Sequence, residues 1–222
     1  MKNGIIVAMS LILLSACGNT ANESEKKETT TPKEDVKLTS EELESKSFTE
    51  LFKTIDPKDF SENIFKIFGE DFTVITSGNA DNYNSMTAGW GGVGVLFEDP
   101  AAWCFLRANR YTLEYIREEK SFTFSFFPKE NLEQVLYFGQ TSGRNTDKME
   151  NHTLSAVATP DGNMTYKEAR LVIECDLTEI STVHPDDFYL QKGKEFIEGG
   201  FEEAKDYHKI VFGMIKNIWI KK

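Results

Sequence analysis

Short runs of β-branched and aromatic residues recur along most of this chain, and turn residues separate them without a regular alternation of strand and helix. Such runs predict strands, and the lack of strict strand–helix–strand repeats disfavours a parallel nucleotide-binding sheet. We therefore expect a mainly β protein, a β-barrel interrupted by helices. The predicted strands cover residues 72–76, an extended run that reaches Trp90 after a polar turn at 78–82, and residues 102–107, 121–127, 155–158, 169–177, 188–190 and 209–220.

Helical periodicity is confined to a few segments. Apolar residues three and four apart predict two short helices within residues 47–68, one on each side of Asp56-Pro57, and further helices at 110–119 and 129–138. In the last of these, Leu132, Val135 and Leu136 form one apolar stripe, and Gly139 follows where a left-handed residue commonly ends a helix.

The N-terminal residues have the layout of an export signal. Lys2 precedes an apolar run and then Leu14-Ser15-Ala16-Cys17, which is similar to a bacterial lipobox. That resemblance implies a signal peptide at 1–16, a lipid on Cys17, and a protein anchored to the cell membrane on its extracytoplasmic side. Two or more acyl chains make such anchoring stable. An ordinary secretory signal with an incidental cysteine is the alternative.

A polar segment lies between this signal and the part of the chain that is expected to fold. Residues 17–46 are rich in Lys, Glu, Thr and Ser with almost no aromatics, which predicts a solvated linker rather than a partner-binding tail. One domain, 47–222, has enough apolar residues for a substantial core.

Charge and cysteine usage exclude several classes of function. A net charge of -11 argues against a nucleic-acid partner, because such affinity depends on many Lys and Arg contacts with phosphate. Cys104 and Cys175 lie in apolar strand-like runs, so two buried unpaired thiols are expected. The three histidines are scattered, and no metal site is predicted.

Small residues, hydroxyls and cations gather between residues 84 and 148 of this otherwise acidic chain, as a planar ligand with a phosphate requires. In Asn84-Ser85-Met86-Thr87-Ala88, side chains alternate between faces, and we expect Ser85 and Thr87 to offer hydroxyls to the ligand while Met86 packs inside. An ordinary barrel strand is the alternative.

Cations follow in two further segments. Arg110-Tyr111-Thr112 stand at a predicted helix start, where free amide groups and the helix dipole favour a phosphate, and Arg107 can reach the same place. Thr141-Ser142-Gly143-Arg144 form a small-residue loop, with Asp147 expected to pair with Lys148. Solvated surface arginines and an ordinary surface loop are the alternatives.

Five motifs in one order resemble the flavin reductase family, over residues 71–220. They are N-S-M-T-A-G-W-G-G from Asn84, R-Y-T from Arg110, F-T-F-S-F-F from Phe122, S-G-R-N-T-D-K from Ser142, and D-Y-H from Asp206. The resemblance implies an FMN-binding split barrel of Greek-key type and a homodimer, with Trp90 and residues 93–97 apolar enough to be buried between subunits. It also implies His208 near the reactive face of the flavin, although a solvent-facing histidine is an equal alternative. The flavin would lie against Asn84, Ser85, Met86, Thr87, Ala88, Arg107, Arg110, Tyr111, Thr112, Ser142, Gly143, Arg144 and Lys148.

The resemblance further implies a flavin reductase, an oxidoreductase that moves electrons from NAD(P)H through bound FMN to free flavin or another acceptor. Reduced nicotinamides are cytosolic, however, so an exported protein needs another source, such as a membrane redox donor. The alternative function is a non-catalytic surface lipoprotein that binds flavin or another small ligand. A haem-binding split barrel is a third possibility, with only three histidines as candidate axial ligands.

Overall fold

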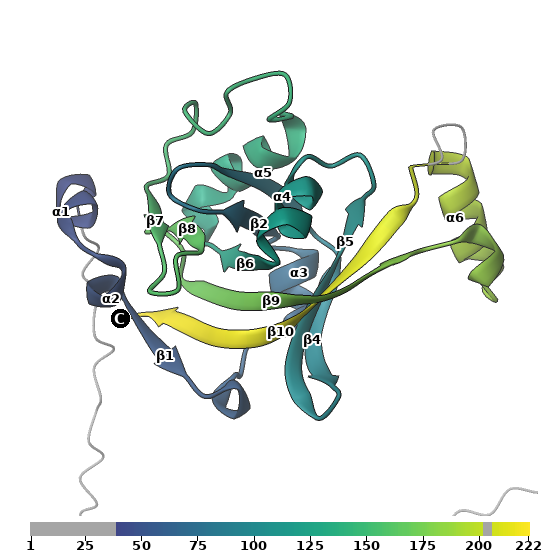
Figure 1. Cartoon of the computed structure of the whole chain (residues 1–222), viewed down its shortest axis with the longest axis horizontal. Helices are drawn as coiled ribbons and strands as arrows, with labels where there is room; N and C mark the ends of the chain where they lie inside the picture. Colours follow the sequence, from purple (N-terminus) through teal and green to yellow (C-terminus); the bar gives the residue numbers. More distant parts are fainter. Residues whose placement is uncertain (1–38, 202–205) are drawn as a thin grey trace, which may run out of the picture. The chain divides into compact units, whose positions relative to one another are not determined.

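A computed structural model describes residues 39–201 and 206–222 of the chain. The expected signal peptide, Cys17 and residues 17–38 of the expected linker lie outside the described residues. In the described part, ten strands, six α-helices and three 3-10 turns follow one another (Figure 1). The strands are β1 Phe52–Ile55, β2 Thr73–Gly78, β3 Tyr83–Ala88, β4 Gly91–Leu96, β5 Asp99–Arg107, β6 Ser121–Phe126, β7 Ala156–Ala158, β8 Met164–Tyr166, β9 Leu171–Thr182 and β10 His208–Lys221. The helices are α1 Ser40–Ser45, α2 Phe48–Leu51, α3 Ile64–Gly69, α4 Thr112–Glu119, α5 Leu132–Gln140 and α6 Gln191–Phe201, with 3-10 turns η1 Pro57–Asp59, η2 Lys129–Asn131 and η3 Pro185–Asp187.

The main sheet is antiparallel and has the strand order β3-β2-β6-β9-β10-β5-β4, with β1 added along β10. Met86 of β3 and Ala102 of β5 belong to one buried apolar cluster although their strands stand near opposite ends of that order. The sheet therefore curls around its core, and the expectation of a mainly β barrel with helices is confirmed. Phe124 and Phe126 are fully buried in this core.

Strand β10 holds the parts of the sheet together. It pairs with β5 through its first half, with β1 through its last residues, and with β9 along most of its length. Gly213 lies at one of two irregularities in the β9–β10 pairing, and a Cβ atom there would meet the Cys175 side chain at 2.6 Å. A glycine is thus required for the two strands to approach at this bend. Cys104 and Cys175 are both buried and free, as expected.

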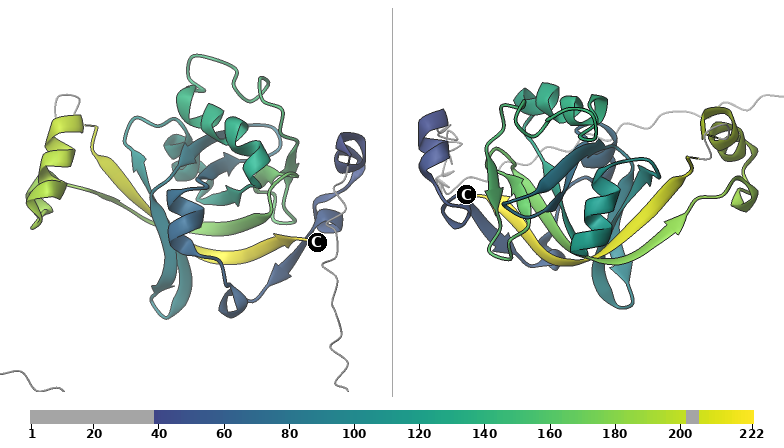
Figure 2. Two further views of the ribbon diagram at one scale, coloured as in Figure 1. Left: turned by 180° about the vertical axis from the view of Figure 1, so that it is seen from behind. Right: turned by 45° about the horizontal axis from the view of Figure 1, so that its top comes forward.

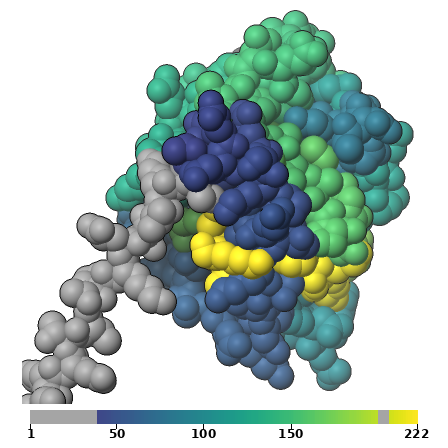
Figure 3. All heavy atoms as spheres, turned by 90° about the vertical axis from the view of Figure 1, so that its left-hand side faces the viewer, coloured from purple at the N-terminus to yellow at the C-terminus, as the bar shows by residue number. Residues whose placement is uncertain are grey.

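The helices occupy different parts of the sheet. Helix α4 packs on β2, β3 and β6, α5 packs mainly on β3, and α3 packs on β4 (Figures 1 and 2). Helix α6 lies at one end of the long β9–β10 pair, and α1 and α2 lie at the other. The backbone N–H of Lys222 donates to the carbonyl of Leu51, which joins the end of β10 to α2 (Figure 3).

Four expectations about local structure are wrong. Residues 52–55, whose apolar spacing suggested helix, form β1, because β10 offers its edge for hydrogen bonding and this pairing outweighs local periodicity. Residues 188–190 form no strand and instead link η3 to α6. Residues 40–45, in the expected linker, form α1, whose N-cap Thr39 and Glu42 make a capping box. Gly139 lies inside α5, which ends at Gln140; a Cβ atom on it would stand 3.1 Å from Thr87, so the glycine permits close helix–strand packing.

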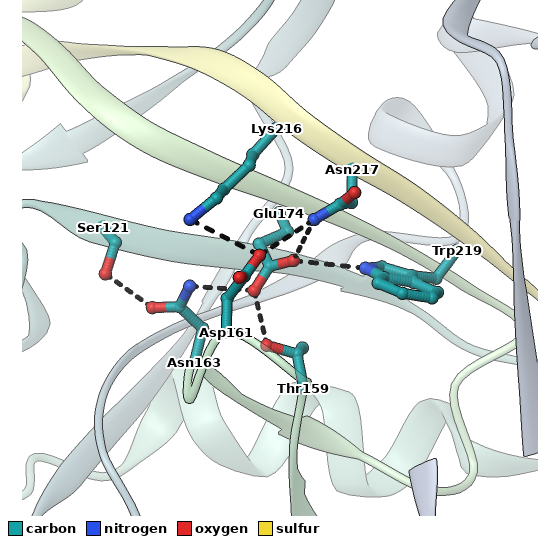
Figure 4. A network of polar contacts seen from close by, with 8 residues as sticks. All are labelled: Ser121, Thr159, Asp161, Asn163, Glu174, Lys216, Asn217 and Trp219. Carbon is teal, nitrogen blue, oxygen red and sulfur yellow. Dashed lines mark hydrogen bonds and ion pairs between the residues drawn. The ribbon is translucent and has the colours of Figure 1, made fainter. Parts of the chain in front are cut away.

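A buried carboxylate network ties the β7–β8 hairpin to the two central strands (Figure 4). Glu174 of β9 is fully buried and accepts four hydrogen bonds from other side chains. Its Oε1 accepts from Thr159 at 2.5 Å and from Asn163 at 2.8 Å, and its Oε2 accepts from Asn217 at 2.9 Å and from Trp219 at 3.2 Å. Around this centre, Asp161 also contacts Asn217 and Lys216. Because both carboxylate oxygens of Glu174 accept hydrogen bonds, the carboxylate can be buried without a large desolvation cost.

Candidate functional site

Two adjoining cavities open between β3, the start of α4 and the loop after α5. The inner cavity has a volume of about 320 Å³ and the outer cavity one of about 630 Å³. Both are lined by Asn84, Tyr111, Gly143, Arg144 and Lys148, so they meet along these residues. The inner cavity is also lined by Met86, Asn109, Arg110, Thr112, Phe138, Thr141 and Ser142.

Strand β3 contributes one face to the inner cavity. Asn84 and Met86 line it, and the Asn84 amide donates to the Thr112 hydroxyl at 2.6 Å, which joins β3 to the first residue of α4. The strand's period of two places both side chains on one face. Asn84 is 2 % exposed, so its orientation is set by packing before any ligand arrives.

Ser85 and Thr87 were expected to turn their hydroxyls toward the ligand, but neither residue lines the inner or the outer cavity. Ser85 is buried on the opposite face, where its hydroxyl bonds to those of Thr76 and Tyr166 at 2.8 and 2.7 Å. The Thr87 hydroxyl donates to the carbonyl of Val135 in α5. Ala88 is buried in the barrel core and lines neither cavity. The predicted alternation of side chains was correct, but the sequence alone did not reveal that Tyr166 of β8 and helix α5 cover the face that carries the hydroxyls.

Helix α4 begins at the inner cavity. Its first residue, Thr112, and the preceding Arg110 and Tyr111 all line the cavity, as does Asn109. The first residues of a helix carry the positive end of its dipole, although the backbone N–H groups of Leu113 and Glu114 already donate to the carbonyls of Arg110 and Tyr111. Burial, with Arg107 nearby, lowers the pKa of Arg110, so the guanidinium has lost hydration that an anion could replace.

Arg107 is placed elsewhere. It lies at the end of β5, outside both cavities, and its Nε stands 2.7 Å from a carboxylate oxygen of buried Asp206. The other oxygen of Asp206 accepts the backbone N–H of Asn109 at 2.8 Å. Arg107 therefore braces the loop that carries Arg110 and does not reach the inner cavity, contrary to the sequence expectation.

The loop after α5 supplies the remaining cations. Arg144 is a surface residue whose guanidinium forms a forked pair with Glu114 and lies 4.6 Å above the Tyr111 ring centre. Ser142 and Gly143 line the inner cavity beside it. A Cβ atom on Gly143 would stand 2.3 Å from the Asn84 amide oxygen, so only glycine permits this approach of loop and strand.

Lys148 is the buried cation of the site. It is 3 % exposed, and its Nζ donates to the carbonyls of Phe138 at 3.3 Å and Thr141 at 3.0 Å. Within the part of the chain that the structure describes, no ion pair joins it to Asp147, so that expectation is wrong. Burial, with Arg110 nearby, lowers the pKa of Lys148 to about 8. No carboxylate among the described residues lines the inner cavity, and the two hydrogen-bond acceptors of Lys148 are neutral carbonyls.

His208 does not lie in either cavity. It begins β10, is 7 % exposed, and stacks against the Trp90 ring at a centroid distance of 5.0 Å. Burial and the charge of Arg107 lower the pKa of His208, which favours the neutral imidazole. The structure thus separates His208 from the candidate site residues of the inner cavity.

The sequence reasoning missed several residues of the site. Asn109, Phe138 and Thr141 line the inner cavity, and Tyr83 and Tyr115 line the outer one. Asn109 adjoins a segment that was singled out, and Thr141 belongs to one without having been assigned to the ligand, so the sequence could have indicated both, whereas Phe138 resembles any apolar helix residue. Between residues 39–201 and 206–222, no group of His, Cys, Asp and Glu could hold a metal ion. Nor does any described helix have the length and apolarity to cross a membrane.

Comparison with known proteins identifies the fold. The chain resembles the FMN-binding protein from Thermus thermophilus (TM-score 0.54, 17% identity, 77% of this chain and 82% of that one). It also resembles an FMN-binding domain of a flavin reductases-like enzyme from Shewanella baltica (0.54, 11%, 76% and 76%). Flavoredoxin from Methanosarcina acetivorans is similar too (0.51, 20%, 74% and 75%). At these identities the likeness establishes the fold, and the expected split barrel is confirmed. No curated protein matched the sequence.

A sequence model of the flavin reductase like domain matches residues 65–222, from α3 to the C-terminal end of β10. The match includes both cavities and all of the main sheet except β1. Since it covers more than half of the sequence, this chain belongs to the flavin reductase like domain family.

Proposed function

We propose that the inner cavity binds FMN, with its phosphate beside Arg110, Lys148 and the N-terminal end of α4. The observation that carries this proposal is the buried Lys148, which lines the inner cavity together with Arg110 and no carboxylate. A phosphate dianion would replace the hydration that both cations have lost. The similar FMN-binding protein from Thermus thermophilus and the similar FMN-binding domain from Shewanella baltica support the same ligand here.

The flavin ring would extend from the phosphate toward β3. Asn84 offers a fixed amide, and Met86 and Phe138 offer apolar surface on the same cavity. Ring binding of this kind needs a mostly apolar slot with a few fixed polar groups. Ser142 and Thr112 supply hydroxyls between the two ends. Bound FMN would supply hydride and single-electron chemistry, and the protein would supply binding, orientation and limited water access.

On this basis the protein is a flavin reductase-type redox protein that passes electrons from NAD(P)H or a membrane redox donor to free flavin or another acceptor. The membrane donor follows from the proposed lipid anchor on Cys17, which would hold the domain on the extracytoplasmic side of the cell membrane. A homodimer also belongs to the proposal: Val95 and Phe97 are 76% and 73% exposed on the β4–β5 hairpin, and such an apolar surface suits a subunit interface.

Spectroscopy of the purified full chain tests this function. FMN should bind stoichiometrically with a change in its visible spectrum, and NADH, NADPH or a chemical reductant should bleach the bound flavin. Bleaching by the chemical reductant alone would favour a membrane donor over NAD(P)H. If free flavin never reoxidises the reduced, bound FMN, the protein is the non-catalytic binding protein. If the protein takes up no FMN, the proposal is refuted.

The affinity for FMN should depend on pH above about pH 8. Lys148 has a pKa of about 8 in the free protein, and a bound phosphate raises that pKa because it favours the charged form. Above pH 8 the free protein loses this proton and must take it up on binding, so affinity falls by at most about tenfold per pH unit. Titrations between pH 7 and 10 measure this slope. Lys148→Met should bind weakly with no such slope, and an equal slope in that variant would contradict the assignment.

Gly143→Ala should weaken FMN binding by about tenfold. The new methyl group would meet the Asn84 amide oxygen at 2.3 Å, and Asn84 cannot move without losing its bond to Thr112, a loss of about 1 kcal/mol or more. Gly69→Ala in α3 is the matched control, since nothing lies within 4 Å of its Cβ position. Isothermal titration with FMN measures the affinity of both variants. Equal FMN affinities in Gly143→Ala and Gly69→Ala would show that the close approach of Gly143 to Asn84 does not matter for FMN binding.

A further inference from the structure

The segment Asp206-Tyr207-His208 resembles a motif of the flavin reductase family, but none of its residues lines either cavity. Asp206 directly precedes β10 and is 4 % exposed. A carboxylate buried to this extent is stable only where ion pairs or hydrogen bonds replace its hydration. One partner of Asp206 is Asn109, 97 residues earlier, in the segment that joins β5 to α4.

Asp206 holds a tight turn at residues 107–110. In this turn the backbone N–H of Arg110 donates to the carbonyl of Arg107 at 3.0 Å. The backbone N–H of Asn109 takes no part in that hydrogen bond and donates to Oδ1 of Asp206 at 2.8 Å. The second carboxylate oxygen, Oδ2, lies 2.7 Å from Nε of Arg107 in an ion pair. One buried side chain therefore contacts the first and the third residue of the turn.

The turn determines where Arg110 lies. The N–H of Arg110 is bonded within the turn, and its carbonyl accepts the N–H of Leu113 in α4 at 3.1 Å, so its backbone is fixed on both sides. Asn109 and Arg110 line the inner cavity, whereas Arg107 lines neither cavity. A ligand contact is most effective when supporting residues fix it before the ligand binds. Asp206 is such a supporting residue, placed outside the cavity.

The charge of Asp206 and its position have opposite consequences for a phosphate. Burial and the neighbouring Arg107 lower the pKa of Arg110, and the carboxylate of Asp206 opposes this by favouring the charged guanidinium. Arginine stays charged at neutral pH in any case, while the carboxylate repels a phosphate bound beside it. Removal of the Asp206 charge alone would thus strengthen FMN binding, whereas loss of the held turn would weaken it.

We propose that Asp206 is a positioning residue for the FMN phosphate, which holds the turn at 107–110 and thereby holds the Arg110 guanidinium in the inner cavity. The inference rests on the proposed function, because it takes Arg110 as a phosphate contact. It gives the aspartate that precedes β10 a role in binding although the aspartate touches no ligand.

Asp206→Asn should weaken FMN binding by about fivefold, because the phosphate contact of Arg110 is displaced rather than removed. The amide has one acceptor oxygen, so its NH₂ group must face either the Asn109 N–H or Nε of Arg107. Fluorescence titration with FMN measures the loss. Asp187→Asn is the matched control, since Asp187 is exposed and lines neither cavity. Unchanged or tighter binding in Asp206→Asn would overturn the inference.

A double-mutant cycle tests whether Asp206 acts through Arg110. Arg110→Met removes the guanidinium and should weaken FMN binding by about tenfold. In that background Asp206→Asn should change FMN affinity by less than about twofold, because the contact that Asp206 positions is already absent. A merely structural role would lower affinity again, and such additive losses would overturn the inference.

Hydrogen exchange of the wild-type chain tests the same contact without any substitution. Asn109 is exposed, yet its backbone N–H should exchange slowly in the free protein because the buried carboxylate accepts it. Exchange at the rate of an unprotected amide would overturn the inference, even if Asp206→Asn does not fold. Failure of the wild-type chain to bind FMN would instead refute the proposed function, and it would leave the exchange result unaffected.

Discussion

Lys148→Met should weaken FMN binding by about 10- to 100-fold, the largest effect expected of any single substitution in the inner cavity. A hydrogen bond to a charged group contributes about 1.5–3 kcal/mol, and every 1.4 kcal/mol is about tenfold in affinity. Lys148 is nearly completely buried and shares the cavity with Arg110, so water cannot replace its contact with the phosphate. Fluorescence titration with FMN measures the loss.

The fold should survive this substitution. Burial already disfavours the charged form of Lys148, so an apolar side chain of similar length removes that penalty together with two hydrogen bonds to backbone carbonyls. The midpoint of thermal unfolding should therefore change little. Lys53→Met, at an exposed position of β1 outside both cavities, should leave affinity unchanged. Wild-type affinity in Lys148→Met would show that the phosphate lies elsewhere.

Glu174→Gln should destabilise the folded protein by about 3 kcal/mol, because each buried donor without an acceptor costs about 1–3 kcal/mol. The new NH₂ group must face either the Asn217 and Trp219 donors or the Asn163 donor, since the carboxylate accepts from both sides. The Thr159 hydroxyl can turn and accept, whereas the Asn163 amide would have to flip and the Ser121 hydroxyl, which now donates to it, would have to accept instead.

Thermal unfolding measures this loss. For a protein of this size, 3 kcal/mol corresponds to a fall in the unfolding midpoint of about 6–12 °C. Glu179→Gln is the matched control, because Glu179 is exposed on the same strand and should change stability by less than about 0.5 kcal/mol. A midpoint equal to that of the wild type would mean that the network rearranges around the amide. FMN affinity should change little, since Glu174 lines neither cavity.

The barrel could be predicted from the sequence because its strands carry local signals. Residues 121–126 and 208–221 are dense in β-branched and aromatic residues, and both form the expected strands. The helix at α4 was also predicted, to within two residues of its start. Where local and tertiary preferences conflict, as at residues 52–55, the pairing with β10 prevails, and periodicity alone could not reveal that this edge was available.

For the candidate site, the sequence determined which chemistry gathers between residues 84 and 148, because residue type fixes charge and hydrogen-bonding capacity wherever a side chain lies. Only the tertiary structure decided which face of β3 meets the cavity, that Arg107 pairs with Asp206, and that His208 lies under Trp90. These outcomes depend on which helix covers which side of a strand and which charges meet across the sheet. Both the covering of a strand by a helix and the pairing of charges depend on contacts between residues that are distant in sequence. Such contacts leave no periodic signal along the chain.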